Sequence, residues 1–295
     1  MPDHQRRQRN GSGRRQRPRP PRNHGLGTSN QDRQELLSGS DEEQEQGGFR
    51  GLGEMGKFLR GESAEQGGEE AAAATELTRP EAAVKAAHLT YLEGVELHGE
   101  DASWETLGSN QGPLVDQMEA DNNAGDGGYE WCGMFIGHSY KKAGIRDEIL
   151  RRLVFWSGYR LHLFFTEGRY IDGSFGDWCT AHQTVQIGAV TGEDRKAALD
   201  AFAPQAGDIA LFRSDYSHVG MVTSYDSATG TLEIIEGNRG DRVQATAYDT
   251  GDNQITFLGR FNDADYDAET AIDQDVIDAP SPEVDHGGAG AGGIG

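Results

Sequence analysis

The chain has 295 residues, and its 27 Lys and Arg against 49 Asp and Glu give a net charge of −22 at pH 7. A folded part this acidic is not expected to have nucleic acid as its main partner, and no stretch of about 18 apolar residues predicts a transmembrane helix. The two cysteines, Cys132 and Cys179, are too few for a disulfide framework or a four-thiolate zinc site.

The charge is unevenly distributed and divides the chain into four predicted parts. Residues 1–34 hold nine arginines and two aspartates, a balance of +7, which leaves −29 for residues 35–295. We expect a basic disordered head over 1–34, which has almost no apolar residues, and a linker rich in Glu, Gln, Gly and Ala over 35–75, which one short apolar island between Phe49 and Leu59 interrupts. Residues 76–262 are the predicted folded domain, and 263–295 form a predicted disordered tail that is acidic and then Gly-rich.

Three helices are predicted in the first half of the domain. Thr78 and Glu81 have the spacing of a capping box and mark the start of the first helix. A second, shorter helix is expected over Gln111–Ala120. A third has apolar residues at helical spacing from Cys132 onward and ends before Gly144, a residue type that favours helix termination.

The second half of the domain changes to a strand-like pattern. Ser227–Gly230 is a predicted hairpin turn between two of the strands. Between the two halves, Ile149–Ile171 is rich in Leu, Phe, Trp and Tyr and is expected to join the core, as a helical insertion or as the wall of a cleft. Helices followed by an antiparallel sheet predict an α+β fold. The predicted strands are Asp208–Phe212, His218–Tyr225, Thr231–Glu236, Arg242–Tyr248 and Gln254–Phe261.

Cys132 and His218 are the candidate catalytic residues. A free thiol has a pKa of about 8.5 and needs activation to act as a nucleophile at neutral pH; Cys132 lies where a helix dipole would favour negative charge, and His218 begins a strand from which it can take the proton. Glu236 ends the partner strand and is expected to orient the imidazole. Asn238 shares its face by strand period and is expected to hold His218 or to polarise the substrate. Cys179 is predicted to be structural, with a second reactive thiol as the alternative.

Four motifs around these residues resemble the CHAP domain, the cysteine, histidine-dependent amidohydrolase/peptidase family within the NlpC-type papain-like hydrolases. The resemblance covers about residues 80–262 and implies a papain-like fold in which the nucleophile begins a helix that packs on an antiparallel sheet. The motifs are Trp-Cys-Gly-Met-Phe at 131–135, Gly-Asp-Ile-Ala-Leu-Phe at 207–212, Ser-His-Val-Gly-Met-Val at 217–222 and Glu-Gly-Asn at 236–238.

The resemblance also implies an activity and a set of roles. Cys132 would be the nucleophile and His218 the base, with Glu236 and Asn238 supporting the histidine. Such domains generally cleave amide bonds in peptidoglycan, as amidases or endopeptidases, and require no cofactor. The long segment between Gly144 and the second motif departs from the family pattern and leaves the shape of the cleft open.

The loop Asp121–Asp126 is the candidate metal site of the sequence. Its side chains offer oxygen ligands at short spacing, and some members of the resembled family hold calcium just before the catalytic cysteine. An EF-hand is excluded, because its sixth position requires Gly and its twelfth an acid, whereas Asp126 and Cys132 stand there. A turn-rich surface loop without a metal is the alternative.

Peptidoglycan or another peptide amide is the predicted partner of the domain. No apolar stretch follows the N-terminal positive charge, so we expect no classical signal peptide, synthesis in the cytoplasm, and export by a non-classical route. The basic head is expected to bind an export machine, nucleic acid or an acidic partner, and one hypothesis is an exported lytic effector or toxin. Two hypotheses compete: an intracellular thiol amidase or peptidase with a non-wall substrate, and a non-catalytic interaction protein that acts through its disordered ends.

Overall fold

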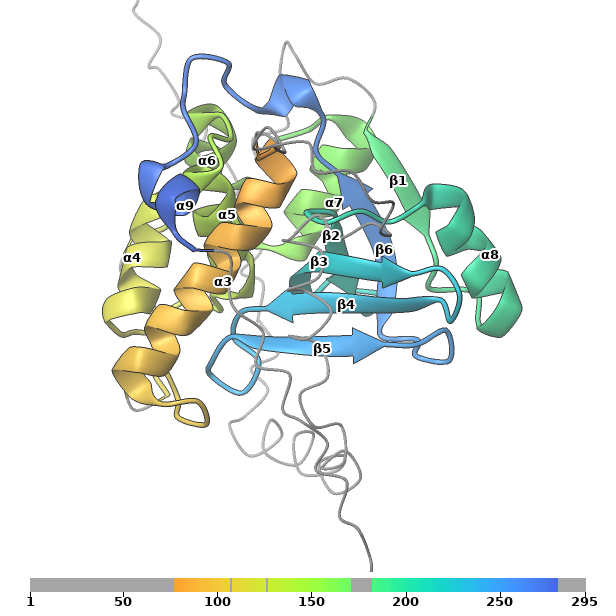
Figure 1. Cartoon of the computed structure of the whole chain (residues 1–295), viewed down its shortest axis with the longest axis horizontal. Helices are drawn as coiled ribbons and strands as arrows, with labels where there is room; N and C mark the ends of the chain where they lie inside the picture. Colours follow the sequence, from red (N-terminus) through yellow and green to blue (C-terminus); the bar gives the residue numbers. More distant parts are fainter. Residues whose placement is uncertain (1–76, 107, 126, 171–181, 281–295) are drawn as a thin grey trace, which may run out of the picture. The chain divides into compact units, whose positions relative to one another are not determined.

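The computed structural model describes residues 77–106, 108–125, 127–170 and 182–280, which hold seven α-helices, two 3₁₀ helices and one six-stranded antiparallel sheet (Figure 1). Most helices precede the strands along the chain, and this confirms the α+β prediction. The predicted basic head and linker, together with residues 281–295 of the predicted tail, lie outside the described residues.

Three helices make the layer that positions the N-terminal half of the site. As predicted, α3 (Arg79–His98) begins at a capping box, in which the Thr78 side chain accepts from the Glu81 backbone N–H and the Glu81 carboxylate accepts from the Thr78 N–H at 2.9 Å. The next two helices, α4 (Pro113–Asp121) and α5 (Cys132–Lys142), also confirm the predicted ones.

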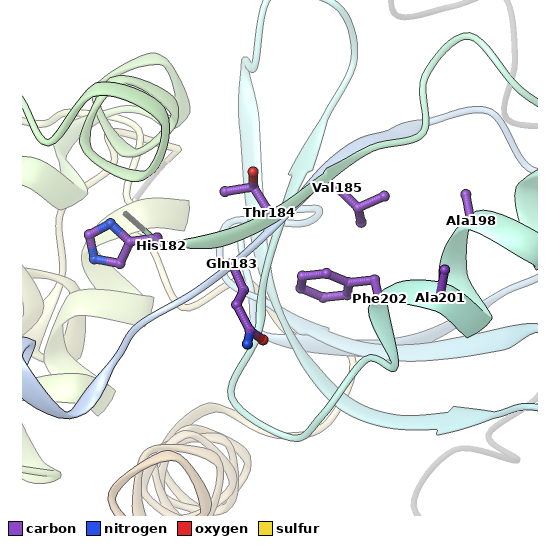
Figure 2. Close-up of a pocket in the computed structure, with 7 residues that line it drawn as sticks. All are labelled: His182, Gln183, Thr184, Val185, Ala198, Ala201 and Phe202. Carbon is purple, nitrogen blue, oxygen red and sulfur yellow. The ribbon is translucent and has the colours of Figure 1, made fainter. Parts of the chain in front are cut away.

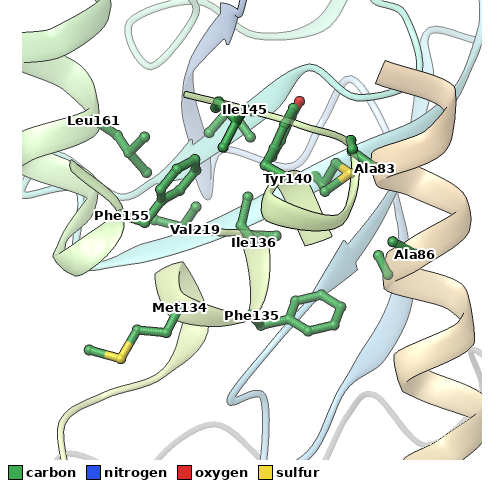
Figure 3. Close-up of a cluster of buried hydrophobic side chains, with 14 of the residues drawn as sticks. Ala83, Ala86, Met134, Phe135, Ile136, Tyr140, Ile145, Phe155, Leu161 and Val219 are labelled. Carbon is green, nitrogen blue, oxygen red and sulfur yellow. The ribbon is translucent and has the colours of Figure 1, made fainter. Parts of the chain in front are cut away.

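The central element of this layer is α5, which packs against α3, α4 and two strands of the sheet, chiefly the one that contains Val219. Every residue of α5 from Cys132 to Tyr140 is buried, because the helix has neighbours on all sides. This explains why its sequence is apolar around most of its circumference. Figure 3 shows its apolar side chains against those of α3 and the strand, with Phe135, Ile136, Ala83, Ala86 and Val219 labelled.

The sheet has the strand order β1-β6-β2-β3-β4-β5, with antiparallel neighbours throughout. Five strands confirm predicted ones, with ends shifted by at most two residues. The sixth, β1, was not predicted, because its sequence lacks an apolar alternation and most of its residues are exposed. The strands are β1 (Gln183–Gln186), β2 (Ile209–Phe212), β3 (His218–Asp226), β4 (Thr231–Glu236), β5 (Gln244–Tyr248) and β6 (Ile255–Arg260).

Both faces of the sheet are covered. Leu211 of β2 belongs to the apolar cluster that includes α3 and α5, whereas its neighbour Phe212 belongs to a second cluster with Leu199 of α8 (Gly192–Phe202). In Figure 1, α3, α4 and α5 lie to the left of the sheet and α8 to the right. Helix α8 was not predicted, since its only buried residues are Leu199 and Arg195.

The aromatic segment Ile149–Ile171 confirms its expected place in the core up to residue 170, where the described part of the segment ends. It forms a helical insertion of α6 (Asp147–Arg151), η1 (Val154–Trp156) and α7 (Gly158–Glu167). Phe155 and its apolar neighbours are buried in the same cluster as α5. The insertion therefore belongs to the domain core rather than to a surface loop.

The prediction of a disordered tail from residue 263 is wrong for residues 263–280. These residues form η2 (Asp263–Asp265) and α9 (Gln274–Asp278), and α9 packs against α3 with Val276 fully buried. None of the helices in the described ranges has both the length and the apolar character needed to cross a bilayer.

Two cations of α3 hold this C-terminal segment. Arg79 donates to the backbone oxygens of Ala143 at 2.8 Å and Thr270 at 2.6 Å, and Lys85 donates to the backbone oxygen of Ile277 at 3.2 Å. Every residue offers a backbone carbonyl. The acidic composition of the segment therefore gives no indication that two cations of α3 bind it.

Candidate active site

Cys132 is the first residue of α5, and its thiol forms no disulfide. Trp131 occupies the N-cap position without a side-chain cap hydrogen bond, and the first turn contains no acidic residue. The positive end of the helix dipole therefore acts on the sulfur and favours negative charge there. Cys132 is only 9% exposed, so a charge on it depends on protein partners more than on water.

Two contacts fix the backbone on either side of the cysteine. Gly133 lies so close to the backbone carbonyl of Phe155 that a side chain at this position would collide with it. On the other side, Trp131 donates from Nε1 to Glu105 Oε1 at 2.8 Å, and its ring stacks on Trp104 with 6.2 Å between ring centroids. The helix start is thus held by close packing and one anchored indole.

His218 and Glu236 meet across the β3–β4 hairpin, as the sequence predicted. His218 begins β3, Glu236 ends β4, and His218 Nε2 lies 2.8 Å from Glu236 Oε2. Gly220 pairs with Glu236 in the sheet, and a side chain at Gly220 would crowd Glu236 Cγ. The glycine of the third motif therefore leaves the space through which the carboxylate reaches the imidazole.

Cys132 is the second group that acts on His218, because its sulfur lies near enough to the imidazole to influence its charge. Because Nε2 faces Glu236, the other ring nitrogen, Nδ1, is the one available to the sulfur. Burial lowers the pKa of His218, but the proximity of Cys132 and the hydrogen bond and negative charge of Glu236 outweigh burial and raise this pKa to about 9. The imidazole is therefore a cation at neutral pH, which stabilises negative charge on the neighbouring sulfur.

The Glu236 carboxylate has two further partners that the sequence reasoning missed. Its Oε1 accepts from Arg239 Nη1 at 2.6 Å and from the Tyr248 hydroxyl at 2.8 Å. Burial raises the pKa of Glu236, whose side chain is 1% exposed, but the hydrogen bond from His218 and the charge of Arg239 outweigh it and lower this pKa below its ordinary value. No motif marks Arg239 or Tyr248, and only the fold brings them to the carboxylate.

The orienting contact expected between Asn238 and His218 is not formed in the structure. Asn238 Nδ2 donates instead to Glu130 Oε2 at 2.9 Å and to Asn110 Oδ1 at 3.2 Å. The strand period does not extend to Asn238, because β4 ends at Glu236 and Asn238 has a φ of 55° in the left-handed region. Its amide ties the end of the hairpin to the residue two positions before the cysteine.

The helical insertion borders both halves of the site. Gly158 at the start of α7 lies against the backbone oxygen of Tyr216, two residues before His218. On the cysteine side, Trp156 contacts Tyr129 with 4.3 Å between ring centroids, and the Arg160 guanidinium lies 4.9 Å from the Trp156 ring centroid. The segment is therefore a helical insertion, as expected, and it packs against residues on both sides of the Cys132–His218 pair.

A cavity lies elsewhere, between β1 and α8. It has a volume of about 620 Å³. In the sheet order β1 is three places from β3, so this groove is separate from the Cys132–His218 pair. Figure 2 shows its lining residues: His182, Gln183, Thr184, Val185, Ala198, Ala201 and Phe202.

The described residues of the Asp121–Asp126 loop do not fit a calcium site. Both carboxylate oxygens of Asp121 bind side chains of α5, Oδ2 at 2.6 Å from His138 Nδ1 and Oδ1 at 2.7 Å from Lys141 Nζ. Asp126 and Cys179 lie outside the described residues. Within the described ranges, no group of three or more His, Cys, Asp or Glu side chains is arranged to hold a metal ion.

Comparison with known proteins was consistent with this geometry. The family model described as the CHAP domain matches residues 124–238, which begin before Cys132 and end at Asn238. No curated protein and no solved structure matches the chain. The matched stretch contains the cysteine, the histidine and the glutamate that the fold brings together. The match over residues 124–238 is consistent with a CHAP domain, the domain of cysteine- and histidine-dependent amidohydrolases and peptidases.

Proposed function

We propose that this protein hydrolyses amide bonds of peptidoglycan through Cys132, His218 and Glu236. The observation that carries the proposal is the meeting of three groups: the Cys132 sulfur at the start of α5, the His218 imidazole near it, and the buried Glu236 carboxylate 2.8 Å from His218 Nε2. A nucleophile, a base and a group that orients the base are what nucleophilic catalysis of acyl transfer requires.

The proposed reaction has two steps. In the first, the Cys132 thiolate attacks the carbonyl carbon, and His218 gives its proton to the leaving amine as the C–N bond breaks and a thioester forms. In the second, His218 takes a proton from water, the resulting hydroxide displaces the sulfur, and a carboxylic acid leaves. Glu236 stays ionised throughout and holds the imidazole in one orientation.

Negative charge develops on the carbonyl oxygen in both steps. The backbone N–H of Cys132, at the start of α5, is the proposed donor to this oxygen, because the N–H groups in the first turn of a helix have no partners within the helix. The proposed charge-stabilising group and the nucleophile are thus parts of one residue.

Peptidoglycan is the proposed substrate because the matched family commonly acts on it. Its stem peptides offer the amide bonds that the proposed chemistry cleaves. The two other hypotheses, a non-wall amide substrate and a non-catalytic interaction protein, predict different results in the same experiment. The proposed exported effector or toxin role depends on the basic head, which lies outside the described residues.

The experiment is digestion of purified sacculi of several chemotypes with the full-length protein, followed by mass spectrometry of the released fragments. The variant is Cys132→Ala, and Cys179→Ala is the matched control because it removes the other cysteine of the sequence. We expect wild type and Cys179→Ala to release fragments with new amino ends, and Cys132→Ala to release none.

The remaining outcomes contradict the proposal at different levels. Cleavage of a peptide-amide library but of no sacculus would replace the wall substrate while keeping the thiol hydrolase. Equal release by Cys132→Ala would remove the cysteine from the mechanism. No cleavage of either substrate, with Cys132 inert to iodoacetamide, would favour the interaction protein.

A further inference from the structure

The proposed mechanism uses one oxygen of Glu236 and leaves the other unexplained. Oε2 lies 2.8 Å from His218 Nε2, whereas Oε1 accepts two hydrogen bonds from side chains outside the matched stretch, which ends at residue 238. These are Arg239 and Tyr248, and they also contact each other through Arg239 Nη1 and the Tyr248 hydroxyl. The carboxylate is therefore held from both sides.

The turn after β4 brings Arg239 back over the carboxylate. Asn238 and Asp241 have φ values of 55° and 60°, and the Arg239 N–H donates to the backbone oxygen of Arg242 at 3.0 Å. This closes a tight turn, and the Arg239 guanidinium lies 5.7 Å from the ring centroid of Tyr248. The arginine is thus placed by backbone conformation and by stacking, in addition to its bond with Glu236.

The aromatic ring of Phe212 links the same residues from another strand. It lies edge-on to His218 with 5.1 Å between ring centroids and edge-on to Tyr248 with 5.3 Å. The imidazole and the phenol are therefore packed against a common apolar surface. Rotation of either ring would disturb its hydrogen bond to Glu236.

Glu236 needs these partners because its side chain is 1% exposed. A buried carboxylate without compensating charge takes up a proton or turns towards water. A protonated Glu236 would not stabilise a cationic His218. The positive charge of Arg239 and the two hydrogen bonds to Oε1 oppose that change and leave Oε2 directed at the imidazole.

We propose that Arg239 and Tyr248 are positioning residues, which keep Glu236 ionised and turned so that it orients His218 beside Cys132. Neither residue touches the sulfur or the imidazole through any hydrogen bond in the described part of the chain, so both act through Glu236. The consequence for catalysis rests on the proposed function, but the positioning itself is testable without a substrate.

The test is a ¹⁵N NMR titration of the His218 ring in the full-length chain. The direction in which the pKa of His218 changes decides the outcome. Removal of a cation near an imidazole by itself raises the pKa of the imidazole. If Arg239 acts by holding Glu236, Arg239→Met lowers the pKa of His218 instead, by about one unit, because the carboxylate is no longer fixed as its anionic partner. Tyr248→Phe, which keeps the ring and removes one hydrogen bond, gives a smaller fall.

Arg242→Met is the matched control. Arg242 lies in the same turn and pairs with the exposed Asp101 at 3.5 Å, so the variant removes an equal charge without touching Glu236. We expect no fall in the pKa of His218 in this variant. Arg239→Lys, which keeps the charge but loses the planar fork, is expected to recover part of the wild-type value.

A second readout connects the proposal to reactivity. The rate of iodoacetamide modification at Cys132, read from its own peptide by mass spectrometry, is expected to fall severalfold in Arg239→Met and to change little in Arg242→Met. If Arg239→Met does not fold, Tyr248→Phe decides the question by the same two measurements.

An unchanged or raised pKa of His218 in Arg239→Met and Tyr248→Phe overturns the positioning role, whatever the activity. If sacculi remain intact with wild type while the His218 titration shifts as expected, the peptidoglycan proposal fails and the positioning role stands.

Discussion

The two halves of the site are held by different forces. The cysteine half depends on close packing, in which Gly133 lies against the backbone of Phe155 and α5 is buried along most of its length. The histidine half depends on charge, since Glu236 is surrounded by His218, Arg239 and Tyr248. Close packing is sensitive mainly to changes in side-chain volume, whereas charge pairs are sensitive mainly to pH and to changes in charge. We therefore expect different kinds of substitution to disrupt the two halves.

In the histidine half, the largest loss of activity is expected when the charge of Glu236 is removed. Glu236→Gln is expected to reduce kcat by on the order of 10²–10⁴-fold, because the neutral amide no longer stabilises the cationic imidazole or satisfies Arg239. Glu233→Gln on the same strand is the control for a charge loss away from His218, and we expect it to retain activity. Retention of wild-type kcat in Glu236→Gln would contradict an orienting role.

In the cysteine half, a single methyl group added at Gly133 should be enough to reduce stability and activity. Gly133→Ala would push the start of α5 away from the carbonyl of Phe155, because the clash is with backbone atoms that cannot rotate aside. We expect a loss of about 1–3 kcal/mol of unfolding free energy, together with lower activity at every pH. Thermal and urea unfolding measure the first effect.

Gly251→Ala is the matched control for this variant, since a side chain there would approach only the carboxylate end of Asp249. Equal stability of Gly133→Ala and wild type would show that close packing does not hold the cysteine half.

The pH dependence should sharpen the contrast between the halves. The pKa of His218 in the folded chain, about 9, lies above its ordinary value of 6.5. Its contribution to stability is therefore complete below about pH 6.5 and is lost as pH rises through about 9. Activity that needs the cationic imidazole should decline over the upper part of the same range.

Urea unfolding of wild type and His218→Gln between pH 6 and pH 10 measures this contribution. We expect the stability advantage of wild type over the variant to shrink as pH rises. A constant difference across the range would mean that the charge of His218 does not contribute to folding.

The smallest effect is expected at Asn238, whose side chain links the end of the β3–β4 hairpin to the cysteine half. Asn238→Ala removes two hydrogen bonds, to Glu130 and Asn110, which are worth about 1 kcal/mol each, so we expect at most about a thirtyfold loss of kcat/KM. The left-handed φ of this residue adds backbone strain in the alanine variant. Asn238→Gly relieves that strain. A smaller loss in this variant would separate the effect of backbone strain from the effect of the two lost hydrogen bonds.

The sequence predicted the elements that follow local rules. The capping box at Thr78, the helix that begins at Cys132 and the β3–β4 hairpin depend on neighbouring residues, and the hairpin alone placed His218 beside Glu236. The residues missed are those whose contacts depend on turn conformation or on the neighbouring strand. Arg239 follows Glu236 by three residues in the turn after β4, and Tyr248 reaches the same carboxylate from β5; neither carries a motif.

Asn238 was placed incorrectly because a strand period was extended past the end of β4. The segment from residue 263 to 280 was predicted disordered because its acidic composition gives no sign of the cations of α3 that bind its carbonyl groups. Both errors arise where tertiary contacts or turn conformation override a local pattern.

The most direct test of the central claim, that Cys132 and His218 form a reactive pair, is the rate of iodoacetamide modification of Cys132 near pH 6 in wild type and His218→Gln. A thiol paired with a cationic imidazole reacts faster at this pH than an isolated one, because more of it is thiolate. We predict that the wild-type rate exceeds that of the variant by at least about tenfold. Equal rates in the two proteins would contradict the account.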